Sequence, residues 1–172
     1  IAIAVSKGPG SYTGLRIGTA TAKGLCYGLE AKLIAINTLE AMAFGISAFY
    51  PDDMLLCPMI DARRMEVYCM VFSKELNVIQ PTKALVIDQN SFAEYLSDQR
   101  MVFFGNGSVK CRVAMSHQPN ALFFEGIHPN AEHIGTLAWR QFQQKQFEDL
   151  ATFEPFYLKD FIDKKPSASN LV

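Results

Sequence analysis

The segment IAIAVSKGPGSYTGLRIGTATAKGL, residues 1–25, contains the features that decide how the chain folds. Its first five residues are apolar, and the cluster SKGPGS at 6–11 ends that run. This pattern predicts a short buried strand followed by a tight turn. Ser11 or Thr13 then provides the N-cap of a helix that we predict over residues 12–29.

A second short apolar run, KLIAI at 32–36, predicts a second buried strand. Asn37 or Thr38 caps the next helix, which we expect to reach about residue 49 and to stop before Pro51. Strand, helix, strand and helix at this spacing are typical of a parallel sheet with crossover helices.

The pattern changes at Pro51-Asp52-Asp53, where we place a boundary between two lobes. Residues 54–60 and 66–72 are predicted as strands of an antiparallel hairpin, joined by the polar turn DARR. The remaining predicted elements are, in chain order, a strand at 84–87, a helix at 90–96, a strand at 101–104, a helix ending at 115, a strand at 121–124 and a helix at 130–146. The tail from about residue 164 is predicted to be mobile.

The composition excludes several classes of protein. The 172 residues are 49% hydrophobic and 19% charged, which is typical of a globular protein and not of a disordered chain. No apolar run reaches the ~20 residues that span a bilayer, and no signal peptide is visible, so we expect a cytoplasmic protein. The formal net charge is −1 and no basic face stands out, so a partner would have to provide most of the contacts that bind RNA.

The four cysteines, Cys26, Cys57, Cys69 and Cys111, are far apart in the sequence and form no C-x-x-C pair. We favour reduced thiols in the core over a disulfide or zinc framework. The chain also begins in the middle of an apolar run, IAIAV, without Met. We therefore expect that an N-terminal part is missing.

Glycines make the first helix unusual. Gly14, Gly18, Gly24 and Gly28 all fall inside it, and each costs about 1 kcal/mol relative to alanine in a helix interior. Small residues four apart leave a groove where another helix can approach closely. The alternative is that the loop before the helix binds a phosphate, but this sequence matches neither G-x-x-x-x-G-K-[ST] nor G-x-G-x-x-G.

We favour the packing interpretation, with a helix of a partner protein as the neighbour, because polar and aromatic side chains are available for a rim. The predicted partner-interface residues are Tyr12, Thr13, Gly14, Leu15, Arg16, Gly18, Thr19, Ala22 and Lys23. The preceding motif loop consists of Gly8, Pro9, Gly10 and Ser11, where the two glycines permit a tight turn.

The segment GPGSYTGLRIGTATAKGL, residues 8–25, is very similar to the GPGSFTGLRIG signature of the TsaB (YeaZ) family. Weaker resemblances follow in the family's order and extend over essentially the whole chain: NTLEAMA at 37–43, DARRMEVY at 61–68, GNG at 105–107, HPNAEHIGTLA at 128–138 and EPFYLKDF at 154–161.

The resemblance implies an α/β protein with the two-lobed actin/Hsp70/sugar-kinase-like (ribonuclease H-like) fold, in which mixed sheets are flanked by helices. Residues 1–51 would be the last two strands and helices of an incomplete first lobe, and residues 52–172 would form the second lobe. Active members of that superfamily hold ATP phosphates in glycine-rich hairpin turns. The corresponding turn here, DARRME at 61–66, has no glycine. Asp61, Arg63 and Arg64 are therefore candidates for a degenerate phosphate turn, but we favour a charged hairpin turn in which Arg64 and Glu66 are paired or solvated.

The resemblance further implies a non-catalytic subunit that heterodimerises with a TsaD-like transferase. That enzyme forms threonylcarbamoyladenosine at position 37 of tRNA. A TsaE-like ATPase would join the pair, tRNA would be bound only through the complex, and the chain alone would form a homodimer. No cofactor is required by this chain, although ATP or ADP at the complex interface is a further expectation.

Neither catalytic residues nor metal ligands are predicted. His128 and His133 are five apart with Pro129 between them, so they do not share a helical face. Two alternatives remain for the function. One is an enzyme of the same superfamily, either a peptidase acting on its paralogue or an ATPase. The other is a homodimeric structural protein without a role in tRNA.

Overall fold

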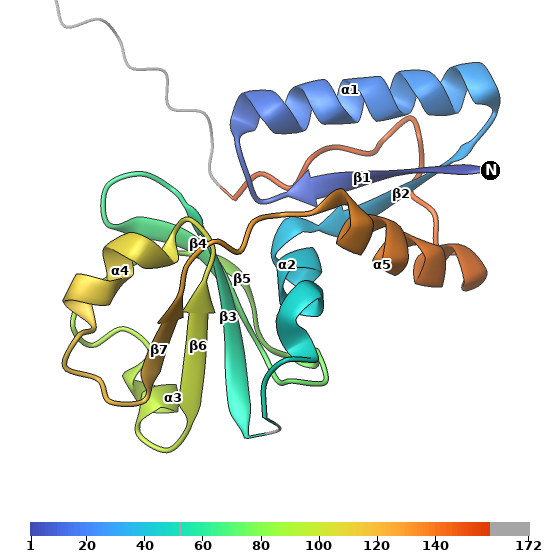
Figure 1. Ribbon diagram of the computed structural model, residues 1–172. Helices are drawn as coiled ribbons and strands as arrows, with labels where there is room; N and C mark the ends of the chain where they lie inside the picture. The colour runs from blue at the N-terminus through green and yellow to red at the C-terminus, as the bar shows by residue number, and fades with distance from the viewer. Residues whose placement is uncertain (52, 159–172) are drawn as a thin grey trace, which may run out of the picture.

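The computed structural model describes residues 1–51 and 53–158. A two-stranded sheet forms the first part: β1 (Ala2–Gly8) runs parallel to β2 (Lys32–Asn37), with Ala2 opposite Lys32. The crossover between them is α1 (Tyr12–Leu29), which covers one face of the sheet, while α5 (Ala131–Gln143) covers the other (Figure 1). This is the parallel strand–helix–strand unit that the sequence predicts.

A second sheet has five strands in the order β5-β4-β3-β6-β7. The strands β3, β4 and β5 pair antiparallel, whereas β3–β6 and β6–β7 pair in parallel, so the sheet is mixed. The bounds are Met54–Asp61 for β3, Glu66–Phe72 for β4, Val78–Val86 for β5, Arg100–Phe104 for β6 and Ala121–Phe124 for β7.

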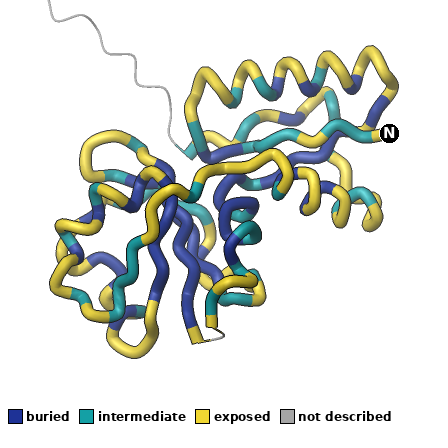
Figure 2. Tube along the Cα trace, in the orientation of Figure 1, coloured by how far each residue is buried: buried dark blue, intermediate teal, exposed yellow. Residues whose placement is uncertain are grey.

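Helices cover both faces of the second sheet. On one face, α2 (Thr38–Ser47) packs its buried Leu39, Met42 and Ile46 against β3, β4 and β6. On the other face lie the short α3 (Ala93–Leu96) and α4 (Ser108–Ala114). Figure 2 shows that burial is concentrated in β2, in β3, β4 and β6 of the second sheet and in α2, whereas α1 is exposed along most of its length.

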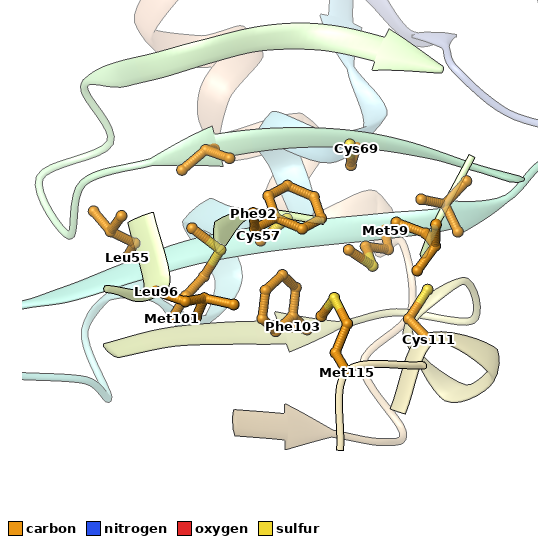
Figure 3. Packing of buried hydrophobic residues seen from close by; sticks show 13 residues of the cluster. Leu55, Cys57, Met59, Cys69, Phe92, Leu96, Met101, Phe103, Cys111 and Met115 are labelled. Carbon is orange, nitrogen blue, oxygen red and sulfur yellow. The ribbon is translucent and has the colours of Figure 1, made fainter. Parts of the chain in front are cut away.

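The core beneath α3 and α4 is rich in sulfur (Figure 3). Cys57, Cys69 and Cys111 are completely buried there, and all four cysteines of the chain are free and buried. The prediction of core thiols is thus confirmed. Burial raises the pKa of the Cys111 thiol to about 11.

The chain returns to the first sheet after β7. The helix α5 packs Ile134, Leu137 and Ala138 against the first sheet and α2. The segment that follows α5 then forms an antiparallel bridge between Glu148 and Leu33 of β2. The predicted division at residue 51 assigns these residues to the second lobe, whereas in the structure they complete the packing of the first sheet.

Most predicted elements are found within a few residues of their expected bounds, with two differences. The strand β5 begins at Val78, six residues before the predicted start at 84. It contains Pro81, which a strand tolerates at the edge of a sheet, and β5 is an edge strand. The helix predicted at 90–96 is reduced to α3, because Asp88 accepts hydrogen bonds from the amide of Asn90 and the hydroxyl of Ser91 and holds a turn there. The mobile tail predicted from about residue 164 lies outside the described residues.

Candidate functional site

The helix α1 begins and ends at well-defined residues. The Ser11 hydroxyl accepts a hydrogen bond from the Gly14 amide (3.4 Å), as an N-cap does. At the other end, Glu30 adopts a left-handed conformation (φ 50°) and terminates the helix. Thr19, Ala22 and Cys26 are the buried residues of α1, and they face the first sheet.

The side of α1 that points away from the sheet is apolar and uncovered. We define the open face of α1 as Ile17, Thr21, Gly24, Leu25, Tyr27 and Gly28, all of them exposed. The exposed fraction is 63% for Ile17 and 83% for Tyr27. A Cβ built on Gly24 or Gly28 would meet no described atom within 4 Å. No helix of the described residues therefore explains these glycines by close packing.

The residues predicted for a partner interface fall into three groups. Thr13, Gly14 and Arg16 are exposed, and the Arg16 guanidinium donates to the Tyr12 hydroxyl at 2.8 Å. In contrast, Thr19 and Ala22 are 6% and 4% exposed and pack inside the chain, which corrects their assignment to a partner surface. The physical reason is that both sides of α1 carry small residues, so small-residue spacing alone does not tell which side faces the sheet.

Three further predicted residues attach α1 to its surroundings. Leu15 is half-buried and packs its Cδ1 against Gly8, and Gly18 is half-buried beside Val5. The Lys23 ammonium donates to the carbonyls of Ala151 (3.2 Å) and Phe153 (3.1 Å). Ile17, Leu25 and Tyr27 are not among the residues predicted for the interface. The apolar Cys26 is the signal that could have placed them there, because it marks the side of α1 that is buried against the sheet.

The motif loop follows β1 at the point where the C-terminal segment crosses it. Gly8 has φ 108°, and a Cβ there would lie 3.0 Å from the Phe156 carbonyl oxygen. The Phe156 amide donates to the Lys7 carbonyl (2.7 Å), and the rings of Tyr157 and Tyr12 pack at 5.3 Å. Gly8 is thus explained by a close approach within the chain.

A cavity of about 390 Å³ lies between the motif loop and the second sheet. It is lined by Val5, Ser6, Pro9, Gly10, Ser11, Gly14, Leu15, Gly18, Thr38, Ile60, Asn106, His128 and Pro129. Its polar side chains include a hydroxyl pair, Ser6 Oγ and Thr38 Oγ1, at 2.6 Å. We call this cavity the interlobe cleft.

The turn between β3 and β4 is organised around a lysine. The Lys110 ammonium of α4 donates to the Asp61 carboxylate and to the carbonyls of Arg64 (2.7 Å) and Glu66 (2.6 Å). Its hydrogen bond holds the pKa of the Asp61 carboxyl below the ordinary value. Arg63 and Arg64 both have positive φ, 72° and 48°. Two of the residues predicted for a degenerate phosphate turn, Asp61 and Arg64, therefore supply oxygens to an internal cation.

The loop Gly105-Asn106-Gly107 presses against the end of β3. Gly105 has φ 93°, and a Cβ on it would overlap the Met59 carbonyl oxygen. A Cβ on Gly107 would lie 2.9 Å from the carbonyl carbon of Ile60. The space beside both glycines is thus taken by backbone of the same chain.

The three histidines lie in different surroundings, and His117 is exposed. His128 lines the interlobe cleft, whereas His133 packs its ring edge-on against Phe44 with centroids 6.0 Å apart. Across residues 1–51 and 53–158, no three His, Cys, Asp or Glu side chains are grouped so as to hold a metal ion. The same residues include no helix that is long and apolar enough to cross a membrane.

Comparison with known proteins places the whole chain in one family. The family model described as "TsaD: tRNA N6-adenosine threonylcarbamoyltransferase" matches residues 1–172. The chain is 41% identical over 166 residues to the tRNA threonylcarbamoyladenosine biosynthesis protein TsaB of Escherichia coli, which covers 92% of this chain and 71% of that protein. It is 36% identical over 110 residues to TsaB of Bacillus subtilis, covering 60% of this chain and 45% of that protein. The chain thus spans less than half of this second relative.

Two solved structures from Pseudomonas aeruginosa have the same fold. One is YeaZ, with a TM-score of 0.71, 24% identity, and coverage of 91% of this chain and 74% of that one. The other is titled as an uncharacterized protein with similarity to peptidase YEAZ, with a TM-score of 0.75, 22% identity and coverage of 92% and 73%. Together with the mixed sheet flanked by helices, these similarities confirm the predicted fold class.

Proposed function

Because the chain belongs to the TsaB (YeaZ) family, we propose that it is a non-catalytic subunit of the machinery that forms threonylcarbamoyladenosine at position 37 of tRNA. It acts by heterodimerising with a TsaD-like transferase, its paralogue in the same family. The function is proposed for the full-length protein, of which this chain spans part.

The open face of α1 is the observation that carries this proposal. It presents Ile17, Leu25 and Tyr27 to solvent beside Gly24 and Gly28, where an added Cβ would meet no described atom within 4 Å. Exposed apolar side chains gathered on one face mark an interaction surface. A helix of the partner can approach the backbone of α1 closely at these two glycines, because they carry no side chain.

The remaining partners follow from the same premise. A TsaE-like ATPase joins the pair, and a homodimer forms through the same face when the transferase is absent. The net charge of −1 favours contact with tRNA through the complex only. This chain requires no cofactor of its own, and ATP or ADP binds at the complex interface. The assembly works in the cytoplasm.

Reconstitution tests the proposal directly. Threonylcarbamoyl transfer to tRNA is measured with the TsaD-like and TsaE-like proteins, with and without the full-length version of this chain. We expect product only when the chain is present and none from the chain alone. Equal product without it would contradict the proposal. Product from the chain alone, or cleavage of the paralogue by it, would instead favour the superfamily enzyme alternative.

A pair of variants tests the surface itself. Gly24→Arg places a bulky charge in the middle of the open face, and the helix remains compatible with arginine because Gly24 has no neighbour there. Gln143→Arg adds the same charge at an exposed position of α5 and serves as the control. We expect Gly24→Arg alone to abolish binding to the transferase in calorimetry. Normal affinity in that variant would assign the interface elsewhere.

A further inference from the structure

The turn 61–66 directs oxygen atoms toward one point, as a site that binds a cation does. Three oxygens converge on the Lys110 ammonium: one from the Asp61 carboxylate, one from the Arg64 carbonyl and one from the Glu66 carbonyl. An ammonium group has three hydrogens to donate, so these acceptors match its full capacity. The side chain of Lys110 is only 21% exposed.

The turn's amides are directed inward, away from any external anion. The Arg63 amide donates to the Asp61 carboxylate (2.7 Å), and the Ala62 amide donates to the Glu66 carbonyl (3.0 Å). The Asp61 amide donates to the side-chain oxygen of Asn106 (3.0 Å), and the Glu66 amide donates to the Arg63 carbonyl (3.1 Å). Phosphate sites in turns depend on backbone amides that point at the ligand. Four such amides are already used here.

Three parts of the second lobe meet at this turn. Lys110 comes from α4 and binds the β3–β4 turn, while the loop 105–107 contacts that turn through Asn106 and packs on β3 through its glycines. Ile60 and Asn106 both line the interlobe cleft. The arrangement therefore fixes the wall of the cleft that belongs to the second lobe.

We propose that the turn 61–66 is a cation cage filled by the Lys110 ammonium, which holds this wall of the interlobe cleft closed to phosphate groups. The lowered pKa of Asp61 is consistent with a carboxylate that remains charged beside the ammonium. The charged hydrogen bonds also hold Arg63 and Arg64 at positive φ, which is unfavourable for residues with a side chain.

Chemical rescue tests the cage. Lys110→Ala removes the ammonium and leaves room for a small cation, so we expect the Tm to fall by about 5 °C. Ammonium chloride should restore part of that loss, and tetramethylammonium chloride at the same ionic strength should not, because it donates no hydrogen bond. Lys110→Met keeps the cage filled without charge, so its Tm should not respond to ammonium. Lys145→Ala, at an exposed lysine, controls for loss of one positive charge.

Several outcomes would contradict the proposed cation cage. One is a Tm of Lys110→Ala equal to that of the wild type, and another is an equal response of this variant to both salts. Titration of the wild type with Mg·ATP is expected to show no binding. Binding that disappears in Lys110→Ala would make Lys110 a phosphate ligand.

A measurement on the wild type is independent of whether the variants fold. In ¹⁵N-detected NMR of the full chain, the Lys110 ammonium should give a slowly exchanging signal, because all its protons are hydrogen-bonded. If every lysine ammonium exchanged as fast as that of an exposed residue, the cage would be refuted. None of these measurements uses tRNA modification, so their failure is distinct from failure of the proposed function.

Discussion

Gly24→Ala is expected to stabilise the isolated chain and to weaken its binding to a partner. Alanine is favoured over glycine by about 1 kcal/mol in a helix interior, because glycine loses more backbone entropy on folding. Gly24 lies well inside α1, and the added Cβ would meet no described atom within 4 Å. No steric penalty therefore reduces the gain, and for a chain of this size the Tm should rise by about 2–4 °C.

Urea denaturation followed by far-UV circular dichroism measures the free energy of unfolding. The midpoint should move to higher urea at an unchanged m-value, since the folded and unfolded surfaces stay the same. Gly45→Ala in α2 is the matched control. It has the same helix propensity gain, but its Cβ would overlap the His133 ring where α2 packs on α5. We expect that variant to lose stability.

The second half of the prediction concerns the partner. If another helix packs closely on the open face, a methyl group at Gly24 overpacks that contact by about 1–3 kcal/mol, so the affinity should fall by about 5- to 150-fold. Calorimetric titration with the TsaD-like transferase measures this. A variant that gains stability and retains full affinity would refute close helix packing at Gly24. A variant that gains no stability would refute the open geometry of α1.

Three further outcomes are expected. The hydrogen bond with Lys110 lowers the pKa of the Asp61 carboxyl in the folded state. The contribution of this carboxylate to stability is therefore present above the unfolded pKa of about 3.9 and is lost as the pH falls through the folded pKa. The difference in unfolding free energy between the wild type and Asp61→Asn, measured in urea titrations, should shrink below about pH 4. All four cysteines are buried, and the pKa of Cys111 is about 11, so Ellman's reagent at pH 8 should label none in the native protein and four in denaturant; rapid native labelling would contradict this packing. Gly105→Ala should destabilise the chain by about 2–4 kcal/mol, because alanine is strained at φ 93° and its Cβ would overlap the Met59 carbonyl, and a Tm within 2 °C of the wild type would argue against the observed loop.

Local signals in the sequence were sufficient for most of the fold. The helix predicted over 12–29 is α1 with those bounds, because Ser11 is the N-cap, as predicted. The strands at 66–72 and 121–124 were also predicted with their observed bounds, since each is a short apolar run between turn residues. The strand predicted at 84–87 begins at Val78 and includes Pro81, which is tolerated because β5 lies at an edge of the sheet, and the sequence does not reveal that position.

Long-range contacts were beyond this kind of reasoning. Lys110 reaches Asp61 across 49 residues, and no periodicity links the two positions. The sequence therefore reveals that the turn is charged, but it does not reveal that oxygens of the turn converge on an internal cation. The contacts of α5 and Glu148 with the first sheet are also long-range and could not be predicted from local patterns. They depend on how two sheets with separate apolar faces dock, and local propensities carry no information about docking.

The attachment of α1 to the C-terminal segment bears on how a partner would bind. Lys23 donates to the carbonyls of Ala151 and Phe153, and Phe153 is buried with Ala22 and Cys26 beneath the helix. A helix held in this way presents its open face without having to be ordered first, and ordering is one of the main costs of association.

Lys23→Met should therefore weaken binding to the transferase by about threefold, although it adds nothing to the open face. Hydrogen exchange should at the same time become faster at the amides of Ala151, Thr152 and Phe153. Lys145→Met, which removes an exposed lysine beyond α5, is the control. Faster exchange at unchanged affinity would show that the C-terminal segment supports the fold but does not preorganise the surface.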